Sequence, residues 1–313
     1  MTSQAMSRPL SRLAWFTLGF NVLVILWGAV VRATGSGAGC GAHWPTCNGS
    51  VIPLSPSLGT LIEYSHRLTS GVALILVVVL LVQVFRHRPA GHLARFWATA
   101  SMVLILTEAA VGAGLVLFER VAGDTSVARG YWISGHLINT FLLLAALVLT
   151  ARFVDGRRAV SPDVEALRAT FPSASRGWPT ILAVLAMVAT GMSGAIAALG
   201  DTLFKAETLR EALAQDFSSA SHIFLRLRIL HPVIALIGGG LVLAVAYRAM
   251  TTNPERPSSR TLGLVLAGLV VTQWFVGLTN LVLLAPTPLQ IVHLLVADLI
   301  WISLVLVAAD PAD

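Results

Sequence analysis

Residues 71–85 read GVALILVVVLLVQVF, a continuous apolar run without a charged residue. An α-helix needs about 20 such residues to cross a bilayer, and this run, which begins near position 67, is long enough. Seven further runs of similar character occur along the chain. Together the eight cover about residues 13–33, 67–85, 97–118, 133–151, 179–199, 229–247, 262–284 and 290–309. The sequence therefore predicts eight transmembrane helices.

The composition excludes most other classes of protein. Of the 313 residues, 56% are hydrophobic and 12% are charged, whereas a soluble domain carries about 25% charged residues. The chain is thus neither an ordinary soluble enzyme, nor a disordered chain, nor a disulfide-rich secreted module. The apolar runs do not alternate with polar residues, as the strands of a membrane β-barrel do. The expected fold is all-α and polytopic.

The arginines predict the orientation of these helices. Basic residues outnumber acidic ones, 21 against 15, and they gather between the apolar runs. Thirteen of the 21 lie at the N-terminus and in the segments 86–96, 152–178 and 248–261, and basic loops stay in the cytoplasm. Both termini are therefore expected on the cytoplasmic side of the inner cell membrane. Because membrane orientation explains the positive charge, no nucleic-acid partner is expected; nor is a cleavable signal peptide.

Four loops are expected on the outer side, near residues 34–66, 119–132, 200–228 and 285–290.

The two halves of the chain look like copies of one another. Thr-Glu-Ala-Ala-Val-Gly begins at Thr107, and Thr-Gln-Trp-Phe-Val-Gly begins at Thr272, 165 positions later. Each half contains four predicted helices, an even number, so both halves enter the membrane from the same face and the repeat is parallel. We therefore expect two four-helix bundles, residues 1–157 and 179–313, joined by a cytoplasmic linker at 158–178.

Four histidines fall near the outer ends of the even-numbered predicted helices: His66, His136, His231 and His293. A lone histidine of this kind is best explained as a polar residue bonded within a helix contact. Four at similar depth, repeated between halves, point instead to function, because ionisable groups are costly inside a membrane. Two imidazoles on facing helices can bind one haem iron from opposite sides. We predict one such haem in each half, on His66 and His136 and on His231 and His293.

The other histidines, His43, His87, His92 and His222, lie in predicted loops and are expected to be solvated.

Glu63 precedes His66 by three residues, which places both side chains on one helix face if the helix has begun by then. A carboxylate beside a haem pocket can stabilise positive charge or move a proton. The alternative is an acid at a helix start, favoured by the helix dipole. Glu108 and Gln273 occupy equivalent mid-helix positions of the two halves. Interhelical hydrogen bonds are expected for both, and a role for Glu108 in a proton path stays open.

Arginines and cysteines flank the predicted histidine layer on its outer side. Arg67, Arg226 and Arg228 are candidates for contacts with haem propionates, because arginine binds carboxylates through two parallel hydrogen bonds. Alternatively, each extends its guanidinium from the membrane interface into water; the same two interpretations apply to Arg32. Cys40 and Cys47 share an outer loop, where a disulfide is permitted. Such a disulfide would either staple the loop or act as a redox pair that passes electrons.

Several motifs resemble the haem A synthase family. They are Val-Arg-Ala-Thr-Gly-Ser-Gly-Ala-Gly-Cys ending at Cys40, Trp-Pro-Thr-Cys-Asn-Gly around Cys47, Glu-Tyr-Ser-His-Arg from Glu63 to Arg67, Gly135-His136, Leu230-His231-Pro232 and Val292-His293. The resemblance covers nearly the whole chain and implies an eight-helix membrane protein of two four-helix halves. Members of this family oxidise the C8 methyl of haem O to a formyl group, giving haem A for haem-copper terminal oxidases.

The resemblance also implies roles for individual residues. The second half would hold a haem b on His231 and His293, and the first half would hold the substrate haem O at His66 and His136, with Glu63 assisting. The family's outer cysteine pair matches Cys40 and Cys47.

Besides haem O and membrane lipid, the expected partners are a haem O synthase and an electron donor of unspecified identity. The alternative function is that of a b-type cytochrome that only transfers electrons. It needs the four histidines but neither Glu63 nor the cysteine loop.

Overall fold

The computed structural model describes residues 3–154, 177–252 and 257–309 of the chain. Eight helices within these ranges are long and apolar enough to cross a membrane, which confirms the predicted number of spans. They are α1 (Ser3–Ala33), α2 (Leu58–His87), α3 (Leu93–Leu117), α4 (Val127–Phe153), α6 (Trp178–Leu203), α9 (Leu230–Thr252), α10 (Pro257–Val282) and α11 (Thr287–Ala309). The described part of the chain is otherwise made of loops and short helices.

Two of these helices begin well before their apolar runs. The hydroxyl of Ser57 caps α2 by accepting a hydrogen bond from the Thr60 amide at 3.2 Å. The hydroxyl of Ser126 caps α4 in the same way. Hydropathy marks the apolar part of a helix, whereas a cap fixes its first residue. His66 therefore lies more than two turns inside α2, and Glu63 lies within the same helix.

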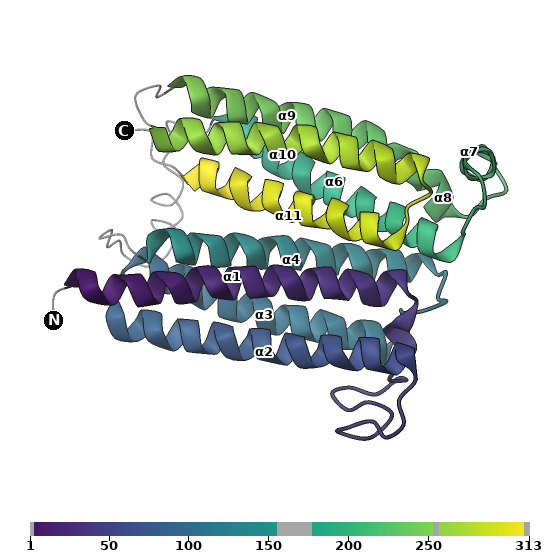
Figure 1. The fold of residues 1–313 in the computed structure, drawn as a ribbon, viewed down its shortest axis with the longest axis horizontal. Helices are drawn as coiled ribbons and strands as arrows, with labels where there is room; N and C mark the ends of the chain where they lie inside the picture. The colour runs from purple at the N-terminus through teal and green to yellow at the C-terminus, as the bar shows by residue number, and fades with distance from the viewer. Residues whose placement is uncertain (1–2, 155–176, 253–256, 310–313) are drawn as a thin grey trace.

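The long helices form two groups of four (Figure 1). Helices α1 to α4 pack together as the first group, and α6, α9, α10 and α11 pack together as the second group. The internal duplication and the domain boundaries stay predictions, and all but the last two positions of the predicted 158–178 linker lie outside the described residues.

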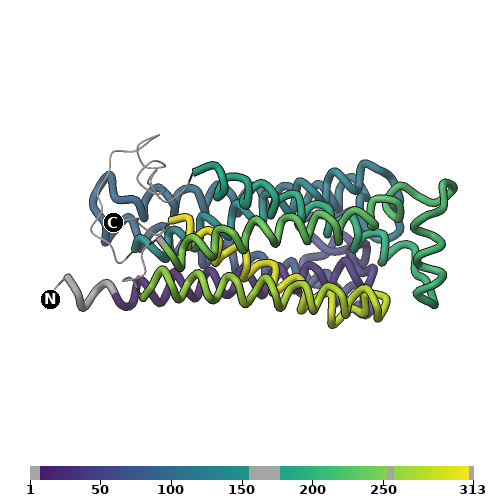
Figure 2. Tube along the Cα trace, turned by 90° about the horizontal axis from the view of Figure 1, so that it is seen from above, coloured from purple at the N-terminus to yellow at the C-terminus, as the bar shows by residue number. Residues whose placement is uncertain are grey.

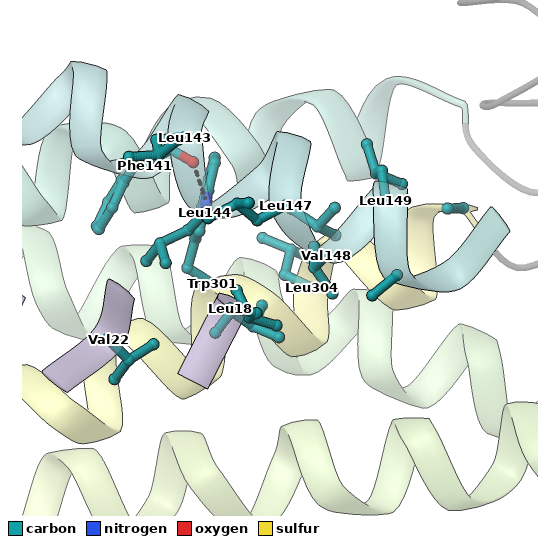
Figure 3. Packing of buried hydrophobic residues seen from close by; sticks show 14 of the residues in the cluster. Leu18, Val22, Phe141, Leu143, Leu144, Leu147, Val148, Leu149, Trp301 and Leu304 are labelled. Carbon is teal, nitrogen blue, oxygen red and sulfur yellow. Dashed lines mark hydrogen bonds between the residues drawn. The ribbon is translucent and has the colours of Figure 1, made fainter. Parts of the chain in front are cut away.

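Helices α4 and α11 carry the contact between the two groups and are the most buried of the spans. Trp301 of α11 stacks on Phe141 of α4 with ring centroids 4.7 Å apart, and its indole N–H donates to the Phe141 carbonyl at 2.7 Å. Leu18 and Val22 of α1 join the same apolar cluster (Figure 3). The other spans expose many large apolar side chains on their outward faces, as a surface against lipid requires.

One end of the bundle carries the short helices and the cysteine loop, and we call it the disulfide end. Helix α1 begins and α11 ends at the opposite end (Figure 1). The expected outer loop at 200–228 is instead largely helical: it contains the end of α6, then α7 (Leu209–Phe217) and α8 (Ile223–Arg228). Helix α7 lies across the disulfide end, as the two views show (Figure 2).

Two of the histidines expected to be solvated have structural roles. His92 is 4% exposed, and its Nδ1 accepts a hydrogen bond from the Ala94 amide at the start of α3. His222 caps α8 in the same manner, through the Phe224 amide. The expectation of solvation is wrong for His92 because an imidazole can replace the usual hydroxyl or carboxylate as a helix N-cap.

Candidate functional site

All four predicted haem-ligand histidines line one cavity of about 1710 Å³ that extends through both helix groups. Its wall is mostly apolar. Its charged side chains are five arginines and five acids: Arg32, Arg67, Arg120, Arg129, Arg228, Glu63, Glu108, Asp201, Asp216 and Asp298. Arg32, Arg129 and Arg228 stand near helix ends at the disulfide end, and Arg67 lies more than two turns inside α2. A cavity of this kind suits a large, flat, apolar ligand that carries carboxylates.

Each of the four histidines faces a glycine on the neighbouring long helix. The pairs are His66 with Gly28 of α1, His136 with Gly112 of α3, His231 with Gly194 of α6, and His293 with Gly277 of α10. A Cβ atom built on these glycines would lie 3.0, 4.0, 2.9 and 3.0 Å, respectively, from the imidazole Cε1. At 2.9–3.0 Å the ring would have to shift by a few tenths of an ångström, so the missing Cβ at three of these glycines permits the close approach of the ring.

The imidazoles of the second group lie close to one another. The ring centroids of His231 and His293 are 6.3 Å apart, with the ring planes at 86°. Two imidazoles that bind one ion from opposite sides, with metal–nitrogen bonds of about 2 Å, have centroids about 6 Å apart. The Ser193 hydroxyl lies 3.0 Å from His231 Nδ1. The Gln273 amide nitrogen lies 3.4 Å from His293 Nε2 and must move aside if that nitrogen binds a metal.

The imidazoles of the first group lie close enough to interact electrostatically, and both line the cavity. The Nδ1 atoms of His66 and His293 are buried without a hydrogen-bond partner among the described residues, and that of His136 has only a long contact with Glu108. Buried ring nitrogens are normally bonded. Histidines left in this state, around an apolar cavity, fit residues that bind a metal centre.

Glu63 is buried on α2, at 3% exposure, and forms part of the cavity wall. Its Oε2 accepts a hydrogen bond from the Cys40 amide at 2.8 Å, and its Oε1 pairs with Arg67 one helical turn away. Glu63 thus shares a helix with His66, as the sequence predicted, and its carboxylate is held in place by the cysteine loop.

Arg67 and a disulfide fix that loop. The guanidinium of Arg67 donates to the carbonyls of His43 and Thr46, each at 2.7 Å. Cys40 and Cys47 form a disulfide, and both are buried. The loop is therefore tied to α2 through side chains that also reach the cavity.

The other two predicted arginines differ in their surroundings. Arg228 joins the ends of three elements: it pairs with Asp201 of α6 and Asp216 of α7, each at 2.6 Å. It also lines the cavity. Arg226 is exposed and lies outside the cavity lining.

Arg32 links the two helix groups, a contact that sequence reasoning missed. From the end of α1 it donates to the Ala198 carbonyl at 2.7 Å and the Thr202 hydroxyl at 2.8 Å, both on α6. It also donates to the Gln290 side chain of α11 at 2.7 Å. No local spacing or motif could have signalled it, because the three partners lie 166, 170 and 258 positions away.

The predicted interhelical hydrogen bonds of Glu108 and Gln273 are confirmed. Glu108 of α3 accepts from Asn139 and Thr140 of α4, and Gln273 of α10 contacts His293 of α11. Glu108 was not among the predicted site residues, yet its Oε1 lies 3.4 Å from His136 Nδ1.

Asp124 organises the turn before α4, outside the spans. It accepts hydrogen bonds from the amide and hydroxyl of Ser126, each at 2.9 Å, and it pairs with Arg120. Burial raises the pKa of Asp124, but these hydrogen bonds and the charge of Arg120 outweigh it and hold the pKa below its usual value.

Comparison with known proteins identifies the family of this chain. Residues 11–305 match the COX15-CtaA family model, described as cytochrome oxidase assembly protein. The whole chain is 45% identical to half of a Thermus thermophilus protein named protoheme IX farnesyltransferase. It is also 37% identical, over 46% of each chain, to heme A synthase of Alkalihalophilus pseudofirmus. To heme A synthase of Shouchella clausii it is 42% identical, over 45% of this chain and 46% of that one.

The chain spans about half the length of the curated relatives it matches. The family model, by contrast, extends across all eight spans of the chain. This chain therefore belongs to the COX15-CtaA family of cytochrome oxidase assembly proteins.

Proposed function

We propose that this chain is a haem A synthase, an oxidoreductase that converts the C8 methyl of haem O to a formyl group and so supplies haem A to haem-copper terminal oxidases. The observation that carries the proposal is the single cavity lined by two pairs of histidines in a member of this family. Relatives named heme A synthase, which match parts of the chain, support the same activity.

In this proposal the first helix group binds the substrate. His66 and His136 hold the iron of haem O, and the apolar wall between the helices accommodates the macrocycle. The isoprenoid tail of haem O is hydrophobic and enters from the lipid between helices. The bundle orients the C8 methyl and keeps bulk water from it.

Glu63 assists the oxidation from the cavity wall. With water as the oxygen source, converting a methyl to a formyl group (R–CH3 + H2O → R–CHO + 4 H⁺ + 4 e⁻) passes four electrons to an external electron acceptor and releases four protons. A carboxylate at the wall can accept one of these protons. The Cys40 amide and Arg67 keep the Glu63 oxygens in one place. A fixed carboxylate stabilises developing positive charge without having to reorient during the reaction.

The second helix group holds a haem b on His231 and His293, whose ring spacing of 6.3 Å fits two ligands of one iron. When bound, this haem supplies one-electron transfer to or from the first group. Arg67 and Arg228 line the cavity and are proposed to approach haem propionates. Arg226 is left out of this proposal because it is exposed away from the cavity lining.

The four histidine–glycine pairs also support the proposed duplication. Gly28 and Gly194 are 166 positions apart, and Gly112 and Gly277 are 165 apart, close to the spacing of the sequence repeat. Two copies of one haem-binding bundle explain why the same close contact recurs in both groups.

We further propose that the protein lies in the cell membrane with both termini in the cytoplasm and the disulfide end outside. The excess of arginine at the opposite end supports this orientation. A haem O synthase is the proposed source of the substrate. The full-length match to half of a protein named protoheme IX farnesyltransferase supports that link.

The decisive experiment is co-expression of a haem O synthase with and without this chain, followed by haem extraction and chromatographic identification of haem A. Haem A should appear only when the chain is present. Purified chain that carries no haem after expression in a haem-replete host would end the proposal.

Variants then separate the enzyme from a b-type cytochrome that only transfers electrons. Glu63→Gln should retain haem and lose most haem A production, because the amide cannot accept a proton. Leu61→Ala, an exposed change on the same helix, is the matched control and should keep full production. Unchanged haem A production in Glu63→Gln would remove Glu63 from the mechanism. Wild-type protein that carries haem but makes no haem A would favour the b-type cytochrome.

A further inference from the structure

The cysteine loop, residues 34–57 between α1 and α2, exposes a run of large apolar side chains. Residues 51–58, which we call the apolar segment, join this loop to α2 and expose four of them: Val51, Ile52, Leu54 and Leu58. Leu54 is 89% exposed. Single apolar residues are common on protein surfaces, but several side by side mark an interaction surface.

The sequence around the apolar segment is free of charge. No Lys, Arg, Asp or Glu occurs between Arg32 and Glu63. The two other long connections at the disulfide end are charged. The connection between α3 and α4 contains Glu119, Arg120 and Asp124, and the one between α6 and α9 contains Lys205, Glu207, Arg210, Glu211, Asp216, Arg226 and Arg228. Charged side chains keep a connection in water, and the cysteine loop has none to keep it there.

The cysteine loop lies beside the bundle and not beyond its end. Figure 1 shows it along the flank of α2, and Figure 2 places it within the length of the bundle, whereas α7 projects beyond the long helices. Helix α2 has 30 residues and is about 45 Å long, which exceeds the hydrocarbon core of about 30 Å. Its apolar run begins only near position 67. The flank of its first turns therefore lies where headgroups meet acyl chains.

The apolar segment continues the face of α2 that the fold turns toward lipid. Leu58 begins the helix, and exposed apolar side chains follow it at helical spacing: Leu61, Leu68, Val72 and Ile75. The segment is thus the end of one apolar surface that runs along the membrane span, and not a separate patch that would need a partner of its own.

The loop can enter this boundary because few of its backbone groups are left without partners. Arg67 already binds two of its carbonyls. Cys47 and Ser50 exchange two backbone hydrogen bonds. Pro53 and Pro56, within the apolar segment, have no amide hydrogen to satisfy. The cost of moving such a backbone out of bulk water is correspondingly low.

We propose that the apolar segment is a membrane anchor, whose side chains insert into the bilayer leaflet at the disulfide end, at the boundary between headgroups and acyl chains. Trp44, on the other arm of the loop, is exposed and belongs to the residue type that gathers at this boundary. Trp44, Pro45 and Val51 also line the cavity, so the anchor holds this part of the cavity wall against the bilayer. The inference does not depend on the proposed haem chemistry.

The test measures the depth of the segment in the full chain, reconstituted in phosphatidylcholine nanodiscs, whose two faces are both open to water. One added cysteine carries an environment-sensitive fluorophore; it alone reacts, because Cys40 and Cys47 form a disulfide. Leu54→Cys reports on the apolar segment. Val72→Cys, on the outward face of α2, is the lipid reference, and Ser219→Cys, exposed in the charged connection at the same end, is the water reference. The quenchers are a lipid with a nitroxide near its headgroup and iodide in the water.

The label at position 54 should be quenched by the nitroxide lipid several-fold more strongly than the label at position 219, and by iodide several-fold more weakly. Ile52→Cys repeats the measurement if Leu54→Cys does not accumulate. Iodide quenching equal to that at position 219 would place the segment in water and overturn the inference. Quenching by neither reagent would show that protein, such as a second copy of the chain, covers the segment, and would also overturn it. Neither result would bear on haem A production, which tests the proposed function separately.

Discussion

Gly277→Ala should weaken haem binding at the second helix group while changing the stability of the polypeptide little. The added Cβ would lie 3.0 Å from Cε1 of His293, whereas ordinary contacts begin at 3.4 Å. The ring must therefore move by about 0.4 Å, which exceeds the spread of about 0.2 Å in normal metal–ligand distances. We expect haem to dissociate about 10–100-fold more readily, the effect typical of a disturbed ligand environment.

The cost in stability should be small for two reasons. Overpacking a helix contact costs about 1–3 kcal/mol, but an imidazole can turn about two side-chain bonds and relieve most of that strain. Replacing glycine by alanine within a helix returns about 1 kcal/mol. The melting temperature of the haem-free protein should then change by at most a few degrees. The variant thus separates ligand geometry from folding.

The assay is the rate of haem transfer from the purified protein to excess apomyoglobin, together with thermal unfolding of the haem-free form. Gly268→Ala is the matched control, because it lies on the same helix with nothing within 4 Å of the added Cβ, and it should behave as wild type. Gly28→Ala against Gly19→Ala repeats the comparison on α1, for the first group. Equal transfer rates for Gly277→Ala and Gly268→Ala would refute the reasoning.

Three further outcomes are expected. Arg228→Gln leaves two carboxylates without their partner, which should destabilise the protein by about 3 kcal/mol. The segment that contains α7 should also become more sensitive to limited proteolysis, and an unaltered cleavage rate would contradict this. Trp301→Phe keeps the stacked ring but loses the hydrogen bond between the helix groups, and it should cost about 1 kcal/mol, measured by thermal unfolding. The lowered pKa of Asp124 stabilises the fold above the pKa of the unfolded chain, and this contribution is lost as the pH falls through the lower pKa of the folded state. Asp124→Asn should therefore be less stable than wild type at neutral pH and approach it in acid, in paired melting curves.

Features carried by a single stretch of residues could be predicted from the sequence. The eight spans follow from local apolarity, and the i, i+3 spacing predicted a shared face for Glu63 and His66 on condition that the helix begins before Glu63. The starts of α2 and α4 could not be found from hydropathy, since Ser57 and Ser126 fix them through caps that precede the apolar runs.

Features that depend on contacts between distant residues escaped prediction. Glu63 is held by the amide of Cys40, 23 positions away, and nothing in either local motif specifies that contact. Arg228 lies in a segment that is typical of the membrane interface. Only the folded chain brings Asp201 and Asp216 to it. The short helix α7 also escaped, although Thr208 with Glu211 three residues later and the spacing of Leu209, Ala212 and Leu213 are signals of a helix start.

The contacts of Arg32 bear on the order in which this protein can be assembled during synthesis. Its hydrogen-bond acceptors are two groups on α6 and one on α11, the last of the eight described spans to leave the ribosome. Until α6 has been inserted, the guanidinium of α1 must be satisfied by lipid headgroups or water, and its bond to Gln290 forms only when α11 follows. The full set of Arg32 hydrogen bonds can therefore form only after α11 has entered the bilayer, so this contact of the early half is completed by the last described span.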